Sequence, residues 1–196
     1  RGKINSALVI APNGIKRNWR KELSVHMPDH VEYMDAVWVA SPKKQEQIEL
    51  MNVCQMSDKL QILIMNIEAL STGRGVDFAR SFLLPGSTLM VIDESTTIKN
   101  HAARRTKNIM KIANLAKYRR IMTGSPVTKS PLDLFSQVEF LGPWLLEQSN
   151  YYAFRARYAV IQQRNVGSHS FQHVVSYQRL DELTAILREF STRILK

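Results

Sequence analysis

The chain has 196 residues, of which 44% are hydrophobic and 22% are charged, so it can bury one sizeable core and is not wholly disordered. Its formal net charge of +10 fits an ordinary basic surface as well as one that binds nucleic acid or another polyanion. The single cysteine, Cys54, excludes an intramolecular disulfide, and no apolar run approaches the roughly 20 residues of a membrane helix.

Strand-like and helix-like segments alternate from residue 6 to about residue 123. Short apolar runs predict the strands, and apolar side chains spaced at helical intervals predict the helices. The alternation predicts an α/β fold with a mostly parallel sheet and helices on both faces. The predicted elements are strands at 6–11, 36–40, 60–65, 89–92 and 119–122, helices at 15–27, 43–56, 68–70, 76–84 and 102–117, and a loop at 72–75.

The pattern changes after Pro131. Helical spacing of apolar residues predicts a helix over 132–141, which Gly142 and Pro143 end. Residues 151–158 are aromatic and basic, residues 166–177 fit a hairpin or an irregular insert, and residues 179–190 predict a final amphipathic helix. We expect residues 1–130 to form the sheet domain and residues 131–196 to form a helical extension packed on it.

Two adjacent carboxylates, Asp93 and Glu94, follow the apolar run at 89–92. Ligands of open parallel sheets bind at the carboxyl ends of the strands, and acids are costly to bury without a partner. One carboxylate can hold Mg²⁺, usually through water, and the next can orient or deprotonate an attacking water. A dipeptide alone is better explained as a helix cap, so the interpretation depends on the segments around it.

Other short motifs accompany the two acids in a fixed order, each at the end of a predicted element. They are Ala11-Pro12 before a helix with Asn18-Trp19, then Asn66 to Leu70, Asp93 to Thr96, Ile98 to Asn100, Thr123-Gly124-Ser125-Pro126, Leu132 to Phe135 and Phe140 to Pro143. In this order the set resembles the first ATPase lobe of superfamily 2 helicases. More narrowly, it is similar to the SWI/SNF-like family of DNA-dependent ATPases and translocases, over nearly the whole chain.

The resemblance implies a RecA-like fold and a role for each matching residue. Asp93 would bind Mg²⁺ and Glu94 would activate water for ATP hydrolysis. Three residues, Thr123, Gly124 and Ser125, would couple the γ-phosphate site to DNA. The residues matching the motifs that contact the DNA backbone are Pro12, Lys16, Arg17, Asn66 and Glu68, for which ordinary loop and cap positions are the alternative.

Two departures from the family pattern matter. The acidic motif usually continues with Ala-His, but here it continues with Ser95-Thr96, which puts the coupling of ATP to DNA in question. The phosphate loop G-x-x-x-x-G-K-[S/T] does not occur in the sequence. In the family this loop lies upstream of the first strand, and a second lobe would lie downstream of Lys196. We therefore expect the chain to be a piece of a larger ATPase.

Three functions stay open at this stage. The first is a DNA-dependent ATPase that uses ATP and Mg²⁺ to move on DNA, for which we expect duplex DNA and a second lobe in the same parent chain as partners. The others are a binding module without catalysis and a strand-separating helicase on DNA or RNA. The basic run from Lys99 to Arg120, which has no acid, fits either a DNA-facing patch or a solvated helix face. We expect weak or absent ATP binding by the isolated chain, no membrane association, and a cytoplasmic location in a bacterium or phage host or a nuclear one in a eukaryote.

Overall fold

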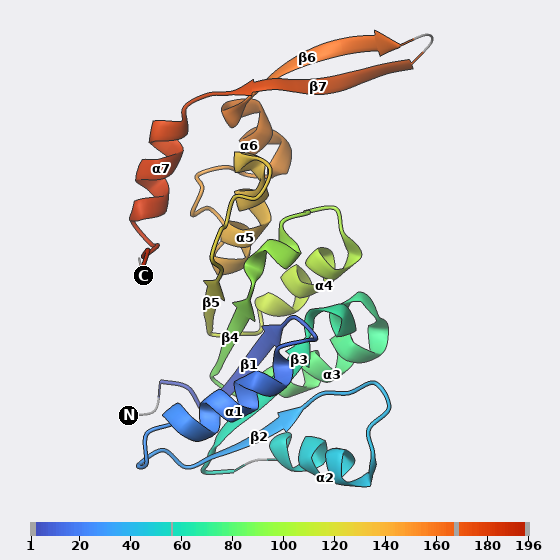
Figure 1. The fold of residues 1–196 in the computed structure, drawn as a ribbon, viewed down its shortest axis with the longest axis vertical. Coiled ribbons are helices and arrows are strands. Elements are labelled where there is room, and N and C mark those ends of the chain that lie inside the picture. Colours follow the sequence, from blue (N-terminus) through green and yellow to red (C-terminus); the bar gives the residue numbers. More distant parts are fainter. Residues whose placement is uncertain (1–2, 56, 167–168, 195–196) are drawn as a thin grey trace.

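The computed structural model describes residues 3–55, 57–166 and 169–194. Its centre is a five-stranded sheet in the order β2-β3-β1-β4-β5, and every neighbouring pair of strands is parallel (Figure 1). The predicted parallel α/β sheet is therefore confirmed. The five strands are β1 (Ser6–Ala11), β2 (Tyr33–Val37), β3 (Leu60–Asn66), β4 (Thr88–Asp93) and β5 (Tyr118–Met122).

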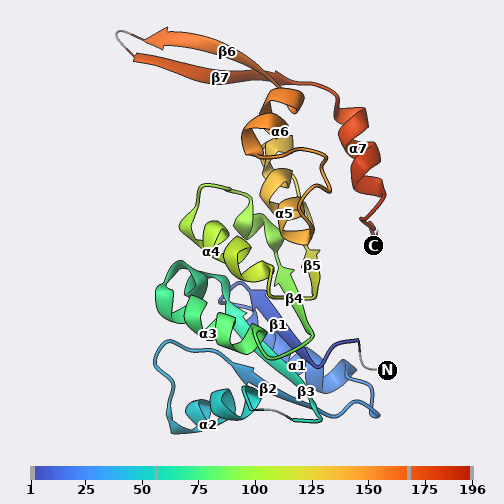
Figure 2. The same cartoon turned by 180° about the vertical axis from the view of Figure 1, so that it is seen from behind.

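Helices cover both faces of this sheet, as the sequence predicts (Figures 1 and 2). On one face, Trp19 and Leu23 of α1 (Lys16–His26), together with Met27 just after it, pack against alternate residues of β1 and β3. On the other face the apolar stripes of three helices meet the remaining strand residues and form the main core. These helices are α2 (Lys44–Val53), α3 (Gly73–Leu83) and α4 (Arg104–Ala113).

Several predicted boundaries are wrong. The second strand begins at Tyr33 rather than at residue 36, and α4 ends at Ala113 rather than at residue 117. The predicted loop at 72–75 is mostly helix, because α3 begins at Gly73. A Cβ on Gly75 would lie 2.2 Å from the carbonyl oxygen of Ala69, so this glycine permits close backbone packing rather than a turn. Met56, the last residue of the predicted helix 43–56, lies outside the described residues.

The extension after the sheet contains helices and a long antiparallel hairpin. The helices are α5 (Leu134–Leu141), α6 (Tyr151–Tyr158) and α7 (Leu180–Arg188), and the hairpin pairs β6 (Ala159–Val166) with β7 (His169–Tyr177). Figures 1 and 2 both show the hairpin projecting from the end of the molecule beyond α6. The prediction placed the hairpin only at 166–177 and so missed its first strand, where Val160 and Ile161 extend the β-branched pattern of Val174 and Val175.

Helix α5 joins the extension to the sheet domain. Its Phe140 is fully buried in the main core, whereas its Leu134, Phe135 and Val138 belong to a second apolar cluster with Phe154, Tyr158 and Leu183. A single helix thus contributes to both cores, and the proposed division at residue 130 stays a prediction. Within the described part of the chain, none of the helices combines the length and apolarity needed to cross a membrane.

Candidate active site at the carboxyl edge of the sheet

The strand register brings the predicted site residues to one edge of the sheet. Ala11 at the end of β1 pairs with Asn66 at the end of β3, and Asp93 at the end of β4 pairs with Met122 at the end of β5. Ile10 pairs with Ile92, so all four strand ends lie level. Pro12, Glu94 and Thr123 each follow directly, and their placement at one edge therefore comes from the parallel sheet itself.

Asp93 is oriented by a tryptophan on helix α1. The indole Nε1 of Trp19, on α1, donates a hydrogen bond of 2.8 Å to Oδ2 of Asp93. Trp19 also packs on the sheet, so the indole is held in place by apolar contacts. The sequence places Trp19 in a motif at the start of a helix; its hydrogen bond to Asp93 comes from the structure.

Glu94 adopts a left-handed backbone conformation, with φ 54° and ψ 64°. A non-glycine residue in this region is strained, and such strain is concentrated at functional sites. Its carbonyl oxygen accepts hydrogen bonds from the backbone N–H and the hydroxyl of Thr97, at 3.0 and 2.9 Å. These contacts hold the turn that follows β4.

Two hydroxyls donate to the Glu94 carboxylate. The Oγ1 atoms of Thr96 and Thr123 lie 2.6 and 2.7 Å from Oε1 of Glu94. Thr123 also accepts a 3.3 Å hydrogen bond from the backbone N–H of Ser125, and Oγ of Ser125 donates to the carbonyl of Val127 at 3.0 Å. The predicted association of the acidic pair with the Thr-Gly-Ser turn is therefore a direct contact, and Gly124 is the exposed link between the two outer residues of that turn.

The departure from Ala-His in the acidic motif has a structural counterpart. Thr96 replaces the usual histidine and supplies one of the two hydroxyls to Glu94. Ser95 replaces the usual alanine, is fully buried, and donates a 2.6 Å hydrogen bond to Oε1 of Gln137 on α5. Gln137 has no sequence signal as a site residue, because a lone glutamine inside an amphipathic helix is usually surface-exposed.

The predicted DNA-backbone residues lie at the ends of β1 and β3. Burial lowers the pKa of Lys16, neighbouring Arg17 lowers it further, and the charges of Glu68 and Glu46 oppose this effect. Asn66 donates a 3.0 Å hydrogen bond to the Glu68 carboxylate, while Pro12 precedes the turn into α1. The Glu68 carboxylate therefore accepts a hydrogen bond from Asn66, and its negative charge suits a positioning role better than contact with a phosphate.

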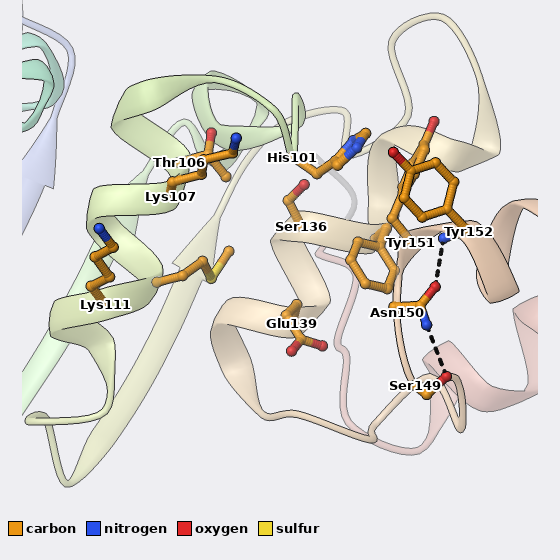
Figure 3. Close-up of a pocket in the computed structure, with 12 residues that line it drawn as sticks. His101, Thr106, Lys107, Lys111, Ser136, Glu139, Ser149, Asn150, Tyr151 and Tyr152 are labelled. Carbon is orange, nitrogen blue, oxygen red and sulfur yellow. Dashed lines mark hydrogen bonds between the residues drawn. The ribbon is translucent and has the colours of Figure 1, made fainter.

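An apolar groove lies away from these acids. It has a volume of about 540 Å³ and lies between α4, α5 and α6 (Figure 3). One wall carries Lys107 and Lys111, Glu139 lies at the base, and the opposite wall carries Tyr152 and a stacked pair of rings, His101 on Tyr151, with centroids 3.6 Å apart. Burial raises the pKa of Glu139, and Arg119 partly opposes this. The groove is separate from the acidic pair but borders the same helix α5.

The donor set at the sheet edge suits a hard cation. One oxygen of the Asp93 carboxylate already accepts the hydrogen bond from Trp19. Side chains that bind metal ions are commonly oriented by such a hydrogen bond from a neighbouring residue. Oxygen ligands of this kind are those that Mg²⁺ prefers. Asp93 would hold such an ion, and the carboxylate of the next residue, Glu94, accepts hydrogen bonds from two threonines.

A family model matches every residue of the chain. The model of the SNF2-related domain family matches residues 1–196. The chain belongs to this family. It is accordingly a SWI/SNF-like member of the superfamily 2 ATPases, as the sequence motifs predict.

Known relatives share the domain at low identity. "Protein CHROMATIN REMODELING 20" of Arabidopsis thaliana is 24% identical over 97% of this chain, and human "DNA repair and recombination protein RAD54-like" is 22% identical over 94% of it. The chain spans 13% and 24% of the lengths of these two proteins.

A solved SNF2 structure shows the same fold. The Sulfolobus solfataricus SWI2/SNF2 ATPase core in complex with dsDNA superposes with a TM-score of 0.67 at 24% identity, covering 98% of this chain and 34% of that one. The RecA-like fold is thus confirmed.

Proposed function

We propose that this SNF2-related domain is part of the first motor lobe of a DNA-dependent ATPase that hydrolyses ATP with Mg²⁺ and moves along duplex DNA. The observation that carries the proposal is the hydrogen bond from Thr123 to Glu94, which joins the acidic pair to the Thr-Gly-Ser turn. Two motifs separated by 29 residues in sequence thereby meet at one carboxylate.

The site residues divide the work of hydrolysis between them. Mg²⁺, when bound with ATP, supplies positive charge that offsets the charge developing on the phosphate oxygens. Glu94 accepts a proton from the attacking water, and its position is fixed by the hydroxyls of Thr96 and Thr123. Thr123 bonds both to the Glu94 carboxylate and to the backbone N–H of Ser125, so a movement of Glu94 would be passed to the Thr-Gly-Ser turn.

The proposed DNA contacts lie at the ends of neighbouring strands. Pro12, Lys16, Arg17 and Asn66 follow β1 and β3 at the same edge as the acids. Lysine and arginine at the start of a helix suit the phosphate backbone of DNA. Sharing one edge with the acids would let DNA binding and hydrolysis influence each other through the sheet.

The first test is ATP hydrolysis by the full-length protein that carries this chain. Parallel reactions contain no nucleic acid, duplex DNA, single-stranded DNA or RNA. Strong stimulation by duplex DNA supports the translocase proposal, whereas preference for single strands or RNA favours a strand-separating helicase. Absence of hydrolysis in every reaction favours the binding module without catalysis.

A matched pair of variants tests Glu94 in the same protein. Glu94→Gln keeps the shape of the side chain but removes the base, so turnover should fall at least about 100-fold while nucleotide binding is retained. Glu147→Gln is the control, because Glu147 is exposed and has the same φ of 54°. Retained turnover in Glu94→Gln would remove Glu94 from the base role.

The isolated chain provides a separate test. We expect it to bind ATP weakly or not at all, since the family places the phosphate loop and the facing lobe outside this sequence. Calorimetry that finds submillimolar affinity for ATP would contradict this expectation.

A further inference from the structure

Gln137 is a buried amide whose polar atoms are all engaged. Its side chain is fully buried on α5. Its Nε2 donates to the carbonyls of Pro126 and Asp133, at 2.7 and 2.8 Å, and its Oε1 accepts the hydroxyl of Ser95 at 2.6 Å. Because two carbonyl acceptors fix the orientation of the amide, its oxygen must face Ser95.

These partners place Gln137 between the two halves of the proposed site. Ser95 directly follows Glu94, and Pro126 directly follows the Thr-Gly-Ser turn. The Thr123–Glu94 hydrogen bond closes the ring on its other side. A closed ring thus runs from Glu94 through Ser95, Gln137, Pro126 and Thr123 back to Glu94.

We propose that Gln137 is a positioning residue that couples the extension to Glu94. The inference rests on the proposed ATPase function for its effect on turnover. Gln137 does not contact the reacting atoms; it acts by fixing the distance between the acidic turn and the Thr-Gly-Ser turn. A shift of α5 would displace Gln137, which is bonded to Ser95 in one turn and to Pro126 beside the other.

Helix α5 is well placed to carry such a shift. Its Phe135 and Val138 pack in the cluster of the extension, and its Phe140 packs in the main core. Its Ser136 donates a 3.2 Å hydrogen bond to the carbonyl of Lys99, in the segment that follows the acids. Ser136 and Gln137, which are adjacent on α5, therefore contact the segment 95–99 twice. Figure 3 shows Ser136 among the residues that line the groove.

Ser95 stands where the family usually has alanine, and its hydroxyl is what binds Gln137. An alanine could not donate to Gln137, and the buried amide oxygen would then lack this donor. Ser95 and Gln137 therefore form one interacting pair, whose energetic coupling a double-mutant cycle can measure.

The test uses the full-length protein with Ser95→Ala, Gln137→Leu and the double variant. Gln162→Leu is the control, because Gln162 is an exposed glutamine on β6. We expect each single variant to lower the duplex-stimulated kcat about tenfold with the KM for ATP within about twofold of wild type, and the double variant to fall no further. Wild-type kcat and stimulation in folded single variants, or additive losses, would overturn the inference.

A second readout separates failure of this inference from failure of the proposed function. Hydrogen exchange of the full-length protein reports the segments 94–99 and 123–127 without requiring turnover. We expect Gln137→Leu to speed exchange in both segments and Gln162→Leu to leave them unchanged. If wild type has no ATPase activity, the proposed function fails, and unchanged exchange in Gln137→Leu would then refute the coupling as well.

Discussion

Trp19→Phe tests whether the indole N–H orients Asp93 for the metal. The substitution keeps an aromatic ring against β1 and β3 but removes the 2.8 Å donor to Oδ2 of Asp93. A hydrogen bond to a charged group contributes about 1.5–3 kcal/mol, and about 1.4 kcal/mol corresponds to a factor of ten. Both residues are partly exposed, so the lower end applies, and we expect about tenfold weaker Mg²⁺ binding.

The assay is an Mg²⁺ titration of ATP hydrolysis by the full-length protein, with Mn²⁺ binding in the presence of nucleotide measured by electron paramagnetic resonance. Trp144→Phe is the control, because Trp144 is 66% exposed. Thermal unfolding separates a general loss of stability from a local effect on the site. A shift of less than about twofold in both titrations, in a folded variant, would refute the orienting role of Trp19.

Three further predictions concern the site, the core and the extension. Thr123→Val removes a hydroxyl from Glu94, and we expect kcat to fall about tenfold with little change in the KM for ATP; a change in KM alone would contradict this. Phe140→Ala should destabilise the chain by about 3–5 kcal/mol in urea unfolding, whereas Phe171→Ala, at a 48% exposed position, should cost less than about 0.5 kcal/mol; equal effects would contradict the shared core. Hydrogen bonds from Arg157 and Tyr158 lower the pKa of Glu182, so its stabilising contribution is present above the unfolded pKa of about 4.3 and is lost as the pH falls through the lower folded value. Glu182→Gln should therefore reduce the dependence of the unfolding temperature on pH between about pH 5 and 3, and an unchanged dependence would contradict the assignment.

The order of elements in the sheet domain could be predicted because its signals are local. The apolar run that ends at Asp93 indicates a strand, and the four-residue spacing of Trp19 and Leu23 indicates a helix. The parallel alternation then implies that the strand ends share one edge, and this implication brings Asp93, Asn66 and Thr123 together.

The errors arise where a long-range contact decides the local structure. Gly75 signals a loop by composition, yet it lies in α3, where the absence of a side chain permits its close approach to Ala69. The first strand of the hairpin was missed because the polar residues Gln162 to Asn165 weaken its β pattern, whereas pairing with β7 fixes it.

The contacts within the site could not be predicted from periodicity. Nothing local to Trp19 or Gln137 shows that their polar atoms reach Asp93 and Ser95. These hydrogen bonds span 74 and 42 residues, so they depend on how α1 and α5 pack against the sheet. The choice of Ser95-Thr96 in place of Ala-His was visible, but its meaning needed the structure.

Because Glu94 has a left-handed backbone conformation, selecting variants for stability alone would act against this residue. A left-handed non-glycine residue costs about 1–2 kcal/mol, so a selection for thermostability should favour glycine or asparagine at position 94. The same selection would accept glycine at Glu147, which has the same positive φ and has no part in the proposed site. A thermostabilised library scored without an activity screen would therefore discard the carboxylate on which the proposed hydrolysis depends.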